Sequence, residues 1–112
     1  MYHVNMSHLL VLNTCPDLAC AKRLAELLID KRLAACVNIV PQVHSVYAWQ
    51  GKLQQTTECQ LLIKTTATRY DELVLMLRQH HPYELPEIIA VPIKAGLPAY
   101  LHWIDQQTET HT

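Results

Sequence analysis

The chain has 112 residues, 50% of them hydrophobic, which suffices for one compact domain and is too short for two. Nine basic and ten acidic residues give a formal net charge of -1, so the charge gives no electrostatic basis for binding nucleic acid or an anionic membrane surface. No apolar stretch approaches the roughly 20 residues of a membrane span, and the amino terminus lacks the pattern of a signal peptide. We therefore expect a cytoplasmic protein.

The first part of the sequence predicts a strand followed by a helix. Residues 7–12 form a short apolar run, and residues 13–17 have the composition of a turn. Apolar residues then recur at helical spacing over residues 18–28. Asp17 stands where a helix-capping residue belongs, so the helix is expected to begin directly after it.

Residues 36–66 predict a long β-hairpin. The apolar and aromatic residues of its first strand share one parity: Val37, Ile39, Val43, Tyr47 and Trp49. We expect a bend or bulge at Pro41, a turn over residues 50–52 and a second strand over residues 53–66. A hairpin of this length exposes strand edges in a small domain, which favours pairing with another subunit.

The last third predicts a helix, a strand and a second helix. Thr68 is expected to cap a helix that ends at His80 and His81. Residues 88–93 are apolar on both parities, which is typical of a strand covered on both faces. A short helix follows from Pro98.

The predicted order of elements is β-α-β-β-α-β with a terminal helix. This order is that of the ferredoxin-like split βαβ arrangement, so the predicted fold class is an α+β sandwich with a long hairpin and a C-terminal helix. We expect a single domain over residues 1–112, with flexible ends at residues 1–7 and 108–112.

Five segments resemble the CutA1 family of divalent-cation tolerance proteins. Their sequences are LAACVNIVP (residues 33–41), SVYAWQGK (45–52), LIKT (62–65), HPYELPEI (81–88) and YLHWI (100–104). The resemblance implies a ferredoxin-like subunit in a tight homotrimer, similar in architecture to PII signalling proteins. It also implies binding of copper and other divalent metals and a role in metal tolerance.

The resemblance implies metal ligands as well. Copper binding in bacterial members is assigned to a cysteine near the end of the first strand and to a His-His pair, which is His80 and His81 here. Asn13 occupies the cysteine position, and Cys15, two residues later in the same turn, is the candidate replacement. Imidazole and thiolate ligands favour copper or zinc over magnesium or calcium. Alternatively, histidines in a last helical turn complement the helix dipole.

A further metal candidate comes from the sequence itself. His3 is the third residue of the chain. A free terminal amine, two backbone amides and the His3 imidazole can form a square-planar four-nitrogen chelate, the geometry that Cu(II) and Ni(II) prefer. We predict that this tail binds Cu(II) independently of the domain.

Polar side chains around the hairpin and the last strand form a second candidate set: Glu58, Lys64, Tyr83, Glu84 and Glu87. They could form an active site with Lys64 as a charge clamp and Glu87 as a base. We favour a network between subunits, because no motif places a nucleophile beside a base. Tyr47 and Trp49 are expected at the trimer interface, where aromatic residues are enriched.

These features predict a cytoplasmic homotrimer that binds divalent metal, copper above all, in metal homeostasis and is not an enzyme. The alternative is a PII-like signalling or scaffold trimer whose clefts between subunits bind a small ligand or a partner protein. Only two glycines are present, so no Gly-rich phosphate loop can form, which counts against a nucleotide. An assembly with a mainly structural role is a third possibility.

Overall fold

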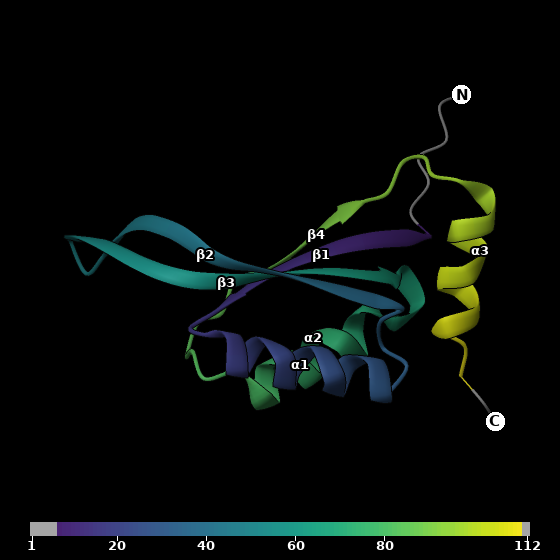
Figure 1. Ribbon diagram of the computed structural model, residues 1–112, viewed down its shortest axis with the longest axis horizontal. Coiled ribbons are helices and arrows are strands. Elements are labelled where there is room, and N and C mark those ends of the chain that lie inside the picture. Colours follow the sequence, from purple (N-terminus) through teal and green to yellow (C-terminus); the bar gives the residue numbers. More distant parts are fainter. Residues whose placement is uncertain (1–6, 111–112) are drawn as a thin grey trace.

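A computed structural model gives the fold and describes residues 7–110. The elements are β1 (His8–Cys15), α1 (Leu18–Asp30), β2 (Cys36–Trp49), β3 (Lys52–Thr66), the 3-10 helix η1 (Ala67–Arg69), α2 (Tyr70–His80), β4 (Ile88–Pro92) and α3 (Pro98–Gln107) (Figure 1). The strands form one antiparallel sheet in the order β2-β3-β1-β4. The predicted α+β, ferredoxin-like arrangement is confirmed.

Helices α1 and α2 cover the same face of the sheet (Figure 1). Their buried residues include Leu24 and Leu28 of α1 and Leu77 of α2, and these belong to one core cluster with Leu61 and Ile63 of β3. Each fully buried aliphatic side chain contributes about 1.5–3 kcal/mol relative to an exposed one. We call the opposite face of the sheet the helix-free face.

Helix α1 begins where the sequence predicts. The Asp17 backbone is extended, and its carboxylate Oδ1 accepts the N–H of Cys20 at 2.8 Å. One of the free amide groups of the first turn is thereby satisfied, as in other N-terminal caps. The preceding strand is longer than expected, because residues 13–15 continue the pairing with β3 as far as Cys15 opposite Cys59.

The hairpin β2–β3 extends well past the ends of α1 and α2 (Figure 1). Its two-residue loop consists of Gln50 and Gly51, whose φ angles of 52° and 77° are those of a type I′ turn. Between Val40 and Val43 the register shifts, and Gln42 has a φ of 58°. The bulge predicted at Pro41 is therefore confirmed.

The bulge changes the face on which the outer half of β2 lies. Before it, Val37 pairs with Ile63 of the core, and after it Tyr47 pairs with Gln54. Directly opposite residues of an antiparallel pair share a face, and Gln54 has the same parity as Glu58. Tyr47 and Trp49 thus lie on the helix-free face, opposite to the face of Val37, although all three residues have the same parity in the sequence.

Helix α3 crosses the end of the sheet where β1 begins (Figure 1). Its Asp105 carboxylate contacts Nε2 of the buried His8 at 2.9 Å. Thr108 is buried, and its hydroxyl donates to the carbonyl of Ile104 at 2.8 Å, while Arg32 donates to the carbonyl of Glu109. Thr108 and Glu109 thus have contacts within the fold, although they belong to the end that was expected to be flexible.

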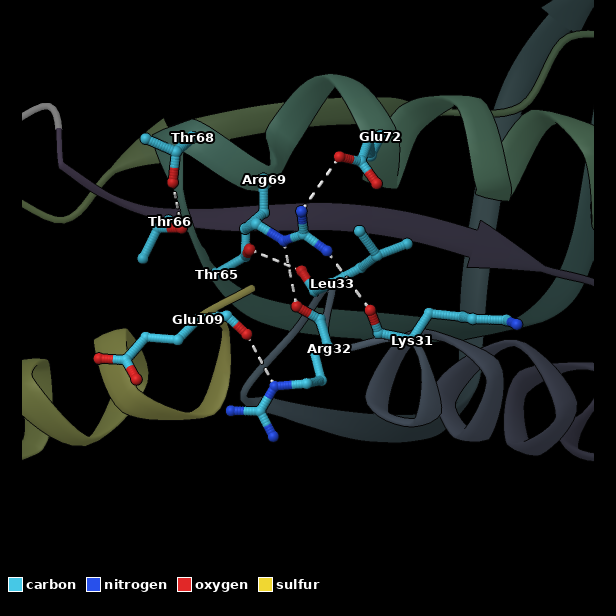
Figure 2. Close-up of polar contacts among 9 residues, drawn as sticks. All are labelled: Lys31, Arg32, Leu33, Thr65, Thr66, Thr68, Arg69, Glu72 and Glu109. Atoms are coloured by element: carbon cyan, nitrogen blue, oxygen red, sulfur yellow. Dashed lines mark hydrogen bonds and ion pairs between the residues drawn. The ribbon is translucent and has the colours of Figure 1, made fainter. Parts of the chain in front are cut away.

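Polar contacts join the end of α1 to the start of α2 (Figure 2). The buried Arg69 donates to the carbonyls of Arg32 and Lys31 at 3.3 and 3.4 Å and to the Glu72 carboxylate at 3.0 Å. Thr68 was predicted to cap α2, and that prediction is wrong. It lies within η1, and its hydroxyl contacts the Thr66 hydroxyl at 3.1 Å.

Strand β4 is an edge strand with one covered face. Ile88 and Ala90 pack against the core, whereas Ile89 and Val91 are 50% and 46% exposed on the helix-free face. The expectation that this strand is covered on both faces is wrong for the single subunit. Within residues 7–110, no helix combines the length and apolar character needed to cross a membrane.

Candidate functional site

An open groove of about 850 Å³ lies between the hairpin and the segment that leads into β4. It is lined by residues of β1, β2, β3 and this segment: Thr14, Ser45, Val46, Tyr47, Trp49, Gln54, Glu58, Pro82, Tyr83, Glu84, Leu85 and Glu87. The bulge in β2 places Tyr47 and Trp49 in this groove, where they are 42% and 49% exposed. Four of the five predicted polar residues and both predicted interface aromatics therefore meet here.

Glu58 is the buried anion of the groove. The residue is only 8% exposed, and its carboxylate accepts a hydrogen bond from the Tyr83 hydroxyl at 2.7 Å. Burial and the neighbouring Glu58 carboxylate raise the pKa of Tyr83, so the phenol stays protonated and donates.

Within the subunit, Lys64 lies apart from the other four residues of the predicted polar set. Its ammonium group donates to the Asn38 side-chain oxygen at 2.6 Å and lies 5.9 Å from the centroid of the Tyr100 ring on α3. Lys64 precedes the end of β3 by two residues, whereas Glu58 lies beside the bulge, so the two side chains occupy different parts of the same strand.

Both ring nitrogens of His81 have partners. Nδ1 accepts the N–H of Tyr83 at 3.1 Å, so the ring proton is on Nε2 and is donated to the carbonyl of Thr14 at 2.8 Å. Burial lowers the pKa of His81 below 6.5, and this effect outweighs the opposing influence of Thr14 and Glu58. The ring is neutral at pH 7 and fixes the segment after α2 against the end of β1.

We predict that His81 makes the protein less stable in acid. Below pH 6.5 the unfolded chain binds a proton at this residue that the folded chain does not, so the free energy of unfolding falls as the pH drops. The fall ends once the pH passes below the folded pKa. Urea unfolding between pH 5 and 7.5, with chelator present, measures this effect. The free energy of unfolding should fall less steeply with decreasing pH for His81→Gln than for the wild type. The control is His80→Gln, at the exposed neighbouring residue, which should keep the wild-type dependence of stability on pH. The same dependence in His81→Gln would contradict the prediction.

The other predicted ligands differ in accessibility. His80 is the exposed last residue of α2. Cys15 is fully buried, and burial, together with nearby Cys20 and Cys59, raises the pKa of its thiol to about 12. The thiol is therefore protonated at neutral pH, whereas a metal-bound cysteine is a thiolate. His3 lies outside the described residues.

Three buried cysteines gather at the end of β1, which the sequence analysis missed. Cys15 lies opposite Cys59, and the thiols of Cys15 and Cys20 interact. Strand pairing brings Cys59 there, and the cap of α1 places Cys20 one turn after Asp17. Among residues 7–110, no three His, Cys, Asp or Glu side chains are arranged to bind a metal ion.

Asn13 has a structural contact at the position where the resemblance expects a cysteine. It is fully buried, and its amide donates to the carbonyl of Glu87 at 2.8 Å, joining β1 to the segment before β4. Its side-chain oxygen is buried and has no hydrogen-bond partner among the described residues. The donors fit copper in type, but in the single subunit only His80 is accessible without rearrangement.

Comparison with known proteins gives consistent matches. Residues 9–107 match the family described as CutA1 divalent ion tolerance protein. Protein CutA of Mus musculus is 45% identical over 97 residues, 87% of this chain but 55% of that protein. The divalent-cation tolerance protein CutA of Pectobacterium atrosepticum is 45% identical over 95 residues, 85% of this chain and 86% of that one. The chain thus spans about half the length of the mouse relative and most of the bacterial one.

The fold matches solved structures equally well. The crystal structure of CutA from Xylella fastidiosa superposes with a TM-score of 0.90 at 46% sequence identity, covering 92% of this chain and 99% of that chain. Sequence and structure comparisons therefore point to the same group of proteins.

Proposed function

Because this chain belongs to the CutA1 family of divalent ion tolerance proteins, we propose that it is a homotrimer that binds divalent metal ions, copper above all, in metal-ion tolerance. It acts by binding metal and not as an enzyme. We place it in the cytoplasm, since its four cysteines are all free, as is usual for proteins in a reducing compartment.

The contact of 2.8 Å between His81 and the carbonyl of Thr14 supports a metal site at the end of β1. It brings the histidine pair to the end of β1, the strand whose last residue is Cys15, although the two segments are far apart in the sequence. His80 is the accessible donor there. His81 can bind a metal only after one of its ring nitrogens gives up its partner, and Cys15 only after it loses its proton, so metal affinity should rise with pH.

Copper titration tests this proposal. Tag-free protein is titrated against a competing chelator beside His80→Ala, the double variant His80→Ala/His81→Ala and His3→Ala. We expect His80→Ala to weaken binding at least about tenfold, since loss of even a group that supports a metal ligand typically costs about 10- to 100-fold. The double variant should abolish tight binding by the domain.

The His3→Ala variant is the matched control. It should remove only a copper equivalent bound by the tail and leave the domain site unchanged. Loss of tight binding in His3→Ala alone, with the double variant unaffected, would assign copper to the tail and contradict the domain site.

The trimer is supported by the helix-free face. Ile89 and Val91 are about half exposed beside the half-buried Leu10, Leu12 and Leu62. A contiguous exposed apolar face marks an interaction surface, and the edge strands β2 and β4 have unpaired backbone groups on their outer sides.

The second candidate is a PII-like signalling or scaffold trimer with a small ligand or partner protein in its clefts. The observation that favours it is the groove beside Glu58. A thermal-shift comparison of nucleotides, small anions and small cations tests it, because a specific ligand stabilises the folded state by mass action.

A further inference from the structure

The Glu58 carboxylate has an uncompensated charge. The residue is 8% exposed, and among residues 7–110 it has no ion pair. Its hydrogen-bond donor is the neutral Tyr83 phenol, at 2.7 Å. A buried carboxylate is costly unless a cation is close, so this site favours a positive charge from outside the subunit.

The rest of the groove also favours a cation. Its lining includes Glu84 and Glu87 besides Glu58 but no lysine, arginine or histidine. The aromatic side chains of Tyr47 and Trp49 are exposed in the same groove. Aromatic faces attract organic cations electrostatically and also pack against alkyl chains. Negative charge and aromatic surface therefore occur together.

We propose that this groove binds a small organic cation, a primary amine, whose ammonium group pairs with Glu58 and whose carbon chain lies against Tyr47 and Trp49. The groove volume of about 850 Å³ accommodates a linear diamine, whose second ammonium group lies near Glu84 or Glu87. An ammonium group donates three hydrogen bonds and requires only one carboxylate as its anchor. A divalent metal ion needs several converging ligands, and among the described residues the groove carboxylates Glu58, Glu84 and Glu87 do not form such a group.

This inference specifies the ligand of the second candidate function and is independent of the copper proposal. It differs from the alternative in which a cationic side chain of another copy pairs with Glu58. That alternative predicts a change of assembly, and not of amine binding, when Glu58 is changed.

Calorimetric titration of the full chain with 1,4-diaminobutane tests the proposal, with chelator present to exclude metal ions. 1,4-Butanediol is the uncharged ligand of the same length, and succinate is the anionic one. We expect the diamine to bind at least about tenfold more tightly than the diol, because charge-assisted hydrogen bonds are about twice as strong as neutral ones. Added salt should weaken diamine binding, a measurement that needs no variant.

Three variants locate the ligand. Glu58→Gln keeps the side-chain shape and should weaken diamine binding at least about tenfold, and Glu87→Gln should weaken it about threefold. The matched control is Glu26→Gln, at an exposed carboxylate of α1 away from the groove, which should bind as the wild type does.

Equal affinity of the wild type for diamine and diol overturns the proposal, as does a Glu58→Gln variant that folds and binds the diamine unchanged. Binding of succinate or a nucleotide without the diamine overturns the ligand class and leaves the second candidate function standing. Failure of all ligands contradicts both. The proposal is also overturned if the wild type does not bind the diamine and Glu58→Gln changes the molar mass of the assembly. In that case the cation that pairs with Glu58 comes from another copy of the chain.

Discussion

Replacing Arg69 by methionine is expected to lower the free energy of unfolding by about 2–3 kcal/mol, because three hydrogen bonds of a charged group are lost at a buried position. Methionine keeps much of the apolar length of arginine, so the change removes polar contacts more than packing. The carbonyls of Lys31 and Arg32, directly after α1, then lose their donor (Figure 2). Urea unfolding at one fixed protein concentration measures the difference.

Arg78→Met is the matched control, since Arg78 is an exposed arginine of α2 and should change the free energy of unfolding by less than about 0.5 kcal/mol. Arg69→Lys should fall between the two, because one ammonium group cannot reproduce the planar guanidinium with its several donors. Equal free energies of unfolding for Arg69→Met and Arg78→Met would show that the contacts of Arg69 between the end of α1 and the start of α2 do not stabilise the fold.

Local sequence patterns predicted most of the fold. Asp17 caps α1 because a short acidic side chain before an apolar helical run satisfies the first amides. The bulge occurs at Pro41 because proline cannot donate to the ladder. The prediction failed at Thr68, whose hydroxyl contacts Thr66 in a 3-10 turn that precedes α2. A threonine before a helical pattern does not specify where the regular helix begins.

The arrangement of the candidate site depends on register, which local patterns do not specify. One extra residue in β2 moves Tyr47 and Trp49 from the core face to the face of Glu58. The sequence predicted the bulge but not this change of face, because the number of inserted residues is fixed only by pairing with β3. Lys64 was grouped with Glu58 by residue type, and the pairing places it beside Asn38 instead.

Burial distinguishes the candidate metal ligands in a way that the resemblance does not. His81 and Cys15 are both good metal donors, but His81 uses both ring nitrogens within the fold and Cys15 lies between two further thiols. These contacts come from residues distant in sequence, such as Thr14 and Cys59. Among the candidate ligands that the structure describes, only His80 has the exposure expected of a ready ligand, and its single-site variant is therefore the sharpest test of copper binding.

The single subunit also shows which surface would be buried between subunits. The helix-free face carries apolar side chains and borders the open edge of β4. A helix lies over it only near the start of β1, where Asp105 of α3 contacts His8. Lysine is absent from β4, and so is any other charged residue that would protect this edge from pairing. An isolated subunit with this face would be prone to association.

Ile89→Asp is expected to convert the assembled protein into monomers that remain folded. Ile89 is 50% exposed in the subunit, so the carboxylate stays hydrated in the monomer, whereas in an apolar interface it costs about 3 kcal/mol or more, over a hundredfold in affinity. Light scattering should give three times the 12.8 kDa subunit mass for the wild type and the single mass for the variant. Trp49→Asp should weaken assembly in the same direction if the groove also lies between subunits.

Leu75→Asp is the control for this prediction, since Leu75 is an apolar residue of α2, 58% exposed, in the helical layer on the other side of the sheet. It introduces the same charge and should leave the molar mass unchanged. A monomeric wild type at tens of micromolar contradicts the trimer itself. An Ile89→Asp variant with the wild-type mass removes the helix-free face from the interface and leaves the edge of β2 as the next surface to be tested.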